Sequence, residues 1–156
     1  MEIFYKNNNL IIQNSSKKEV VFNIESNDVS IDSFSISNSG EYEKGSILAE
    51  VKDYKGILFY HLTLDTHKIV IITNDTFEFT EEILSFFGDV DLLIMPGSKN
   101  SVKVYENIEA KMVLPYGEGK DVFFTAISQH NEEVESIKIK GAIQGDITEF
   151  VNLKVG

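Results

Sequence analysis

Residues 68–97, which read KIVIITNDTFEFTEEILSFFGDVDLLIMPG, show the clearest change of pattern in this chain of 156 residues. The first apolar run is typical of a strand that is buried on both faces. A short helix is predicted at 80–88, because Thr80 can cap its N-terminus, two glutamates follow it, and Gly88 suits the C-terminal cap. A second apolar strand follows at 90–95. This alternation predicts a covered, parallel segment of sheet.

The same alternation continues toward the C-terminus. A helix is predicted at 98–108 and a strand at 111–114. Residues 122–127, which read VFFTAI, could form a helix or a strand, because periodicity does not distinguish the two. Isoleucines alternate with lysines at 137–140, and a final strand is predicted at 147–155. The C-terminal half is therefore expected to combine strands with short helices.

The N-terminal half is expected to form strands alone. The polar pairs Asn7-Asn8 and Asp65-Thr66 suit hairpin turns. Apolar and polar residues alternate between 29 and 36, which is the period of a half-buried strand. The other predicted strands lie at 2–6, 9–13, 19–24, 46–52, 56–64 and 68–73. The expected fold class is α+β, with residues 1–156 forming a single domain and residues 46–74 an antiparallel meander.

The composition excludes several kinds of chemistry. The chain has no Cys, which excludes disulfides, thiolate metal sites and cysteine nucleophiles. It has no Arg, and its net charge of −11 should repel nucleic acid and anionic membranes. No apolar run is long enough for a transmembrane helix, and the N-terminus shows no signal peptide. We therefore expect a cytoplasmic protein with neither a nucleic-acid nor a membrane partner.

Three positions stand out as candidates for a ligand site, each with an ordinary structural alternative. Asp75 follows a buried strand, where catalytic carboxylates are often found, although an Asp there can equally cap a turn. The turn at Gly97 leads from a strand into a helix and could hold an anion, or it could be a simple capped turn. Glu41 and Glu43 share one side of an extended segment and could bind a cation, or form a solvated edge.

Several of these segments, taken in order, resemble the metallo-β-lactamase fold. The likeness is greatest to its small UPF0173-like branch of metal-dependent hydrolases, and it covers about residues 34–156. The segments that are similar to motifs of that branch are Ser39–Gly45, Ile71–Asp75, Phe79–Leu84, Val90–Gly97 and Val113–Glu118. The resemblance implies an αββα-like architecture, here a truncated metallo-β-lactamase-like β-sandwich with a few short flanking helices.

The metal ligands of that family are largely missing from this sequence. The family binds metal mainly through an H-x-H-x-D-H motif, and the chain between Ile24 and Phe34 is too short to hold it. Gly117 stands where the family has a ligand histidine, and Asn7-Asn8-Asn9 stand in place of its G-H-S. Only Asp75 remains, at the place of the bridging carboxylate. A hydrolytic zinc ion needs about three protein ligands, so we expect no metal, no cofactor and no catalytic residue.

The sequence thus favours a metal-free pseudoenzyme that acts through protein contacts, as a homo-oligomer or as the partner of an active paralogue. Asp75, Glu41, Gly97 and Gly117 are expected to be relics or parts of a ligand site. Two alternatives stay open. One is a residual metal-dependent hydrolase or lactonase with other ligands, and the other is a module that binds a small ligand or a cation.

Overall fold

Two-residue turns with positive φ angles shape the N-terminal half of the chain. In the computed structural model, which describes residues 1–155, the predicted turns Asn7–Asn8 and Asp65–Thr66 each have two residues with φ between 47° and 69°. Such turns match the right-handed twist of a hairpin. A third turn of this kind, Asp32–Ser33, divides the alternating run at 29–36 into two strands. Both predicted hairpins are therefore confirmed, and the alternating run is a third hairpin.

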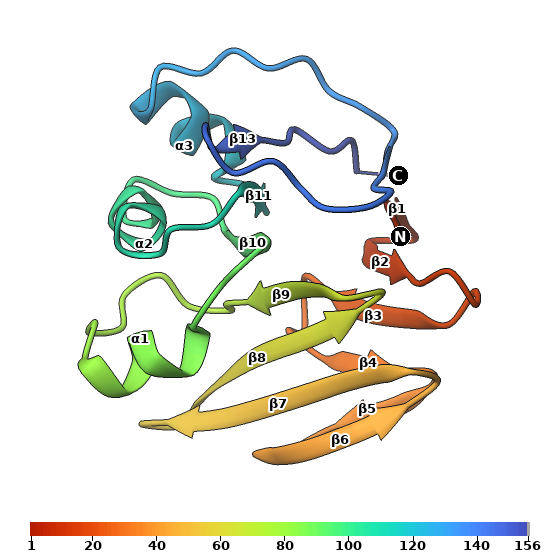
Figure 1. Cartoon of the computed structure of the whole chain (residues 1–156). Coiled ribbons are helices and arrows are strands. Elements are labelled where there is room, and N and C mark those ends of the chain that lie inside the picture. Colours follow the sequence, from red (N-terminus) through yellow and green to blue (C-terminus); the bar gives the residue numbers. More distant parts are fainter. Residues whose placement is uncertain (156) are drawn as a thin grey trace.

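The strands form two sheets. The first sheet is antiparallel and has the order β12-β1-β2-β3-β4-β5. Its strands are β1 (Glu2–Lys6), β2 (Asn9–Gln13), β3 (Glu19–Asn23), β4 (Val29–Ile31), β5 (Phe34–Ile36) and β12 (Ser136–Lys138). Strand β12 therefore brings the C-terminal part of the chain back beside β1, at the edge of this sheet (Figure 1).

The second sheet has the order β13-β11-β10-β9-β8-β7-β6. Its strands are β6 (Gly40–Lys44), β7 (Ile47–Tyr54), β8 (Ile57–Leu64), β9 (His67–Ile71), β10 (Leu92–Pro96), β11 (Met112–Tyr116) and β13 (Glu149–Phe150). Strands β6 to β9 pair antiparallel, whereas β9, β10, β11 and β13 pair parallel. The predicted meander and the predicted parallel segment are both confirmed.

The apolar residues form two cores, one on each side of the second sheet. The larger core lies between the two sheets and includes Ile3, Leu10, Leu62 and Ile94. The other core lies under three helices: α1 (Glu81–Phe87), α2 (Ser101–Asn107) and α3 (Lys120–Ala126). Figure 1 shows these helices along one side of the second sheet, away from β1 to β3. The molecule thus has two sheets and one layer of helices within the described residues.

Local signals place α1 well, whereas packing determines α3. Thr80 Oγ1 accepts the backbone N–H of Ile83 at 3.3 Å, and Gly88 closes the helix with a φ of 56°. The ambiguous segment 122–127 lies mainly in helix α3, where Phe123 and Phe124 are both buried. No helix within residues 1–155 is long and apolar enough to cross a membrane.

The final strand predicted at 147–155 is wrong in its extent. Only Glu149–Phe150 forms a strand, β13. Ile147 is 80% exposed and precedes it without a sheet partner. Beyond Phe150 the backbone turns to the loop before β12, because the Val134 N–H donates to Asn152 O at 2.8 Å. The alternation of side chains was present, but the chain leaves β11 after a last hydrogen bond from the Val151 N–H to Val113 O at 2.9 Å.

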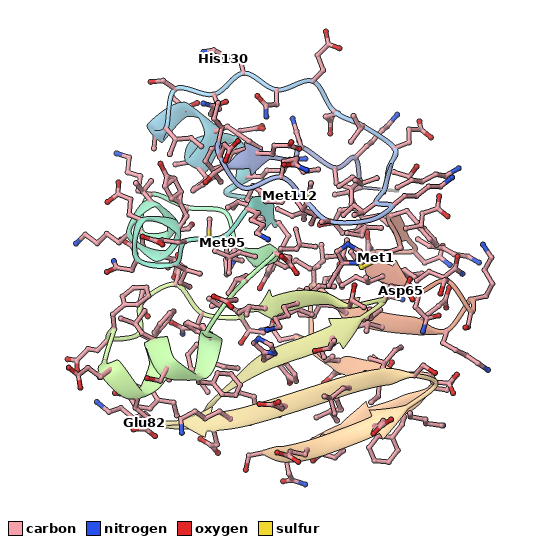
Figure 2. The ribbon with its side chains drawn as sticks, in the orientation of Figure 1. Met1, Asp65, Glu82, Met95, Met112 and His130 are labelled. Atoms are coloured by element: carbon pink, nitrogen blue, oxygen red, sulfur yellow. The ribbon has the colours of Figure 1, made fainter. Side chains whose placement is uncertain are left out.

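Asp65 should make the stability of this fold depend on pH on the acid side. Its carboxylate accepts Ser15 N–H at 2.7 Å and Ser15 Oγ–H at 2.8 Å, and lies 3.6 Å from the Met1 amino group (Figure 2). Partial burial works against ionisation, but these contacts outweigh it and lower the pKa of Asp65. The stabilisation is therefore present above the unfolded-state pKa of about 4 and is lost as the pH falls through the folded-state pKa.

We expect Asp65→Asn to cost about 1–2 kcal/mol at pH 7 and to flatten the loss of stability between about pH 5 and pH 3. Urea unfolding followed by circular dichroism at several pH values measures both effects. Asp146→Asn, at an exposed position, is the matched control and should leave the acid-side slope unchanged. Equal slopes for Asp65→Asn and the wild type would contradict the assignment.

Candidate functional site

The carboxyl ends of β9, β10 and β11 bring three of the four candidate residues to one edge of the second sheet. Asp75 follows β9, Gly97 follows β10 and Gly117 follows β11. Glu41 lies elsewhere, on the edge strand β6, which β7 and β8 separate from β9. There its Cα partner is Glu50. Neighbouring parallel strands end at the same edge, and this brings the three positions together.

Asp75 belongs to a hydrogen-bonded corner at this edge. Ser98 Oγ donates to the Asp75 carboxylate, and the same oxygen accepts the backbone N–H of Ser101 at 3.1 Å. Ser101 Oγ is fully buried and donates to Pro96 O at 2.6 Å. These bonds tie the loop after β9 to the start of α2. Helix α2 begins at Ser101, three residues later than predicted, and its N-cap residue, Asn100, makes no side-chain hydrogen bond.

The loops after β10 and β11 touch each other through glycine backbone. The Gly97 N–H donates to Tyr116 O at 2.7 Å. A Cβ atom on Gly97 would lie 2.6 Å from Lys120 Cα, and one on Gly119 would lie 2.0 Å from Gly97 O. Gly117, by contrast, faces open space but has a φ of +89°. Glycine is thus required at positions 97 and 119 because the two loops approach each other too closely for a side chain. At position 117 it is required by the positive φ angle.

Tyr116 connects this edge to both sheets. Its hydroxyl donates to Ile72 O at 3.1 Å, and its ring meets Phe22 edge to face at a centroid distance of 5.0 Å. Burial raises the pKa of the phenol well above its usual value, and the neighbouring Tyr5 and Asp75 add to the effect. The phenol therefore stays protonated near neutral pH, where it acts as a hydrogen-bond donor.

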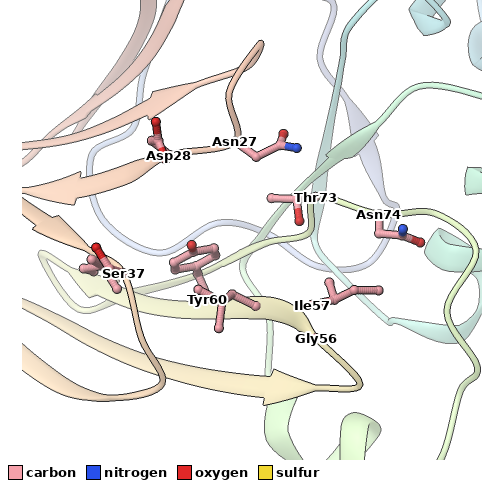
Figure 3. Close-up of a pocket in the computed structure, with 10 residues that line it drawn as sticks. Asn27, Asp28, Ser37, Gly56, Ile57, Tyr60, Thr73 and Asn74 are labelled. Atoms are coloured by element: carbon pink, nitrogen blue, oxygen red, sulfur yellow. The ribbon is translucent and has the colours of Figure 1, made fainter.

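A groove of about 450 Å³ lies beside this corner, between the ends of the two sheets (Figure 3). Its polar side chains come from the β3–β4 turn, from the end of β5, from β8 and from the loop after β9. They are Asn27, Asp28, Ser37, Tyr60, Thr73 and Asn74. Burial, and then the charge of Asp28, raises the pKa of Tyr60. The groove can accept hydrogen bonds from, and donate them to, a small polar molecule.

Sequence reasoning did not find this groove. Its residues lie between positions 27 and 74 and come from both sheets. The local signals were the turn residues Asn27-Asp28 and Thr73-Asn74, which look like ordinary turn residues in the sequence. Only the packing of the two sheets places these turns opposite each other.

The residues at this edge do not fit the zinc ion that the family resemblance implies. Within residues 1–155, no three His, Asp or Glu side chains are grouped so that they could hold a metal ion. His67 Nε2 lies 2.7 Å from Gly141 O, and His61 packs against the Phe86 ring with the centroids 6.2 Å apart. His130 lies on the loop after α3 (Figure 2). Asp75 therefore has Ser98, and not a histidine, as its partner.

Comparison with known proteins supports the fold. No family model and no curated protein matches the chain. A solved structure from Thermotoga maritima, of a candidate Zn-dependent hydrolase of the metallo-β-lactamase superfamily, matches with a TM-score of 0.71. The match covers 97% of this chain and 98% of that one, at 14% sequence identity. At this identity the match establishes the likeness in fold, with two sheets and a layer of helices, and nothing about activity.

Proposed function

We propose that this chain is a metal-free, non-hydrolytic protein on a metallo-β-lactamase-like scaffold, and that it acts by binding another protein chain. The observation that carries the proposal is the hydrogen bond from Ser98 to Asp75, the one carboxylate that the family resemblance places at a metal-ligand position. In that bond a carboxylate oxygen of Asp75 accepts a hydrogen bond that holds the corner together, so that the oxygen has a structural role. In this proposal the chain is a degenerate relative of the UPF0173-like branch.

The β3–β4 connection gives a second line of support. The resemblance would require the H-x-H-x-D-H motif in this part of the chain. Instead, Asn23 Oδ1 accepts the backbone N–H groups of Glu25 and Ser26, both at 3.0 Å, and the Asn27 N–H donates to Asn23 O at 2.8 Å. This is a closed turn of the kind that Asn side chains stabilise. A metal-binding loop would need a longer chain here.

Metal analysis tests the proposal directly. Protein purified without added metal should contain zinc, manganese and iron far below one ion per chain, and should not hydrolyse lactones, β-lactams or phosphodiesters. Near-stoichiometric metal, or hydrolysis that a chelator abolishes, would overturn the proposal in favour of a residual hydrolase.

Substitutions at Asp75 separate a structural role from a ligand role. We expect Asp75→Ala to lower the free energy of unfolding by about 1–2 kcal/mol, because Ser98 loses its acceptor. Asp75→Asn keeps an acceptor oxygen and should cost less. Neither change should alter the metal content. If Asp75→Asn removed bound metal while leaving the stability unchanged, Asp75 would be a ligand after all.

A further inference from the structure

The outer face of the first sheet has no layer of helices within residues 1–155. All three helices pack on the opposite side of the molecule, in the core that they share with the second sheet (Figure 1). In β1, β2 and β3, every second side chain points inward, to the core between the sheets; examples are Ile3, Leu10 and Val20. The residues between them therefore point outward.

An apolar row crosses the middle of this outer face. Phe4, Ile11 and Val21 lie directly opposite one another on β1, β2 and β3, and we call them the outer apolar row. Ile11 is 6% exposed and belongs to neither core, and it lies between Phe4 and Val21 in the row. Phe4 and Val21 are half-buried. Such an arrangement leaves apolar surface on a sheet face that meets water.

Polar residues flank the row on both sides, and the charges of these residues differ between the two sides. On one side lie Glu2, Gln13 and Glu19, which are cross-strand neighbours, and Lys138 on β12 lies opposite Glu2 on the same face. On the other side lie Lys6, Asn9 and Asn23, again on β1, β2 and β3 in that order. Each strand thus carries one residue of each kind, on either side of its apolar residue.

We propose that this face binds a second copy of the same chain, with the two-fold axis along the outer apolar row; this deepens the proposed function and rests on it. Rotation about that axis places each residue of the row opposite the same residue of the second copy. It also places Glu2 on Lys6 of the second copy, Gln13 on Asn9, and Glu19 on Asn23. All three contacts are complementary, and each occurs twice.

The charge pattern selects this axis over the other simple arrangement. A two-fold axis parallel to the strands would superpose β1 on β3 and would set Glu2 against Glu19, twice. Like charges directly opposed across an interface are unfavourable. In the proposed arrangement the strands of the two copies run nearly antiparallel, which is compatible with the aligned packing of sheets.

The size of the face implies a weak dimer. Three strands about 17 Å long and three about 10 Å long, spaced about 4.8 Å apart, present a footprint of roughly 400 Å². A stable interface buries about 800 Å² on each partner, so we expect a dissociation constant of tens to hundreds of micromolar. The net charge of −11 on each copy opposes association. Added salt should therefore strengthen the dimer, because it screens the overall repulsion.

Sedimentation equilibrium on the full chain, from about 10 μM to 1 mM, tests the inference. Lys6→Glu should weaken the dimer by about tenfold, because it sets two glutamates against each other in each of two contacts. The double variant Glu2→Lys with Lys6→Glu should restore it. Ile11→Lys should abolish it, whereas Leu48→Lys, at an exposed apolar position on β7 of the other sheet, should have no effect.

The charge swap keeps the test decisive even if Ile11→Lys lowers stability, because Lys6 is exposed and Glu2 is only half-buried. Thermal unfolding will show that the variants are folded. A chain that stays monomeric up to 1 mM would overturn the inference, as would a dimer that neither Ile11→Lys nor Lys6→Glu weakens. Metal analysis of the same samples keeps the two proposals apart. A metal-free monomer contradicts only the dimer, and a metal-loaded dimer contradicts only the proposed function.

Discussion

Gly119→Ala should lower the free energy of unfolding by more than about 3 kcal/mol, the largest effect that we expect from a single methyl group. The new Cβ would lie 2.0 Å from the carbonyl oxygen of Gly97, and backbone cannot rotate away as a side chain can. Relief requires α3 to move from the loop after β10. The φ of Gly119 is −85°, which alanine adopts readily, so the cost is steric and not conformational.

Gly117→Ala is the matched control, two residues away in the same loop. A Cβ there meets nothing within 4 Å, but the φ of +89° is unfavourable for alanine. We expect a cost of about 1–2 kcal/mol. Urea unfolding of both variants, followed by circular dichroism, gives the comparison. Equal losses for the two variants would mean that the loops after β10 and β11 are further apart than the structure places them.

Phe123→Ala should cost about 3–5 kcal/mol, because Phe123 is fully buried and holds α3 on the second sheet. Its ring lies 6.0 Å from that of Tyr105 on α2 and 6.1 Å from that of Phe150 on β13, measured between centroids. Removing it leaves a cavity among three elements that are distant in the sequence. The loss of α3 contacts should also increase hydrogen exchange in the loop that contains Gly117 and Gly119.

Phe34→Ala provides the control for this substitution. Phe34 is 45% exposed, and its ring contacts Tyr42 at a centroid distance of 5.7 Å. Because nearly half of its surface stays in contact with water, we expect a smaller loss of about 1–2 kcal/mol. A similar loss for the two phenylalanines, or protected exchange in the loop of Phe123→Ala, would show that α3 does not depend on this contact.

Elements with local signals could be predicted closely from the sequence. Thr80 and Gly88 marked the ends of α1, because a helix cap is formed by residues within a few positions of each other. The turns at Asn7–Asn8 and Asp65–Thr66 were equally local. Segment 122–127 remained ambiguous, since its helix depends on burying Phe123 against Tyr105 and Phe150.

The candidate site divides in the same way. Asp75, Gly97 and Gly117 could be placed at one edge, because parallel strands that follow one another end together. The partner of Asp75 could not be predicted, as its bond to Ser98 spans 23 residues and depends on how the two loops pack. The groove also escaped prediction, because its lining residues meet only where the two sheets do.

The amino-acid sequence alone determined the pattern of strands and helices, the net charge and the small number of metal-binding side chains. Each of these depends only on composition or on residues that are near in the sequence. The use of Asp75 as a hydrogen-bond acceptor, the groove beside it and the outer apolar row on β1, β2 and β3 arise only when distant segments pair. The physical reason is that pairing register and sheet packing set which side chains face each other, and both result from burying the cores as a whole.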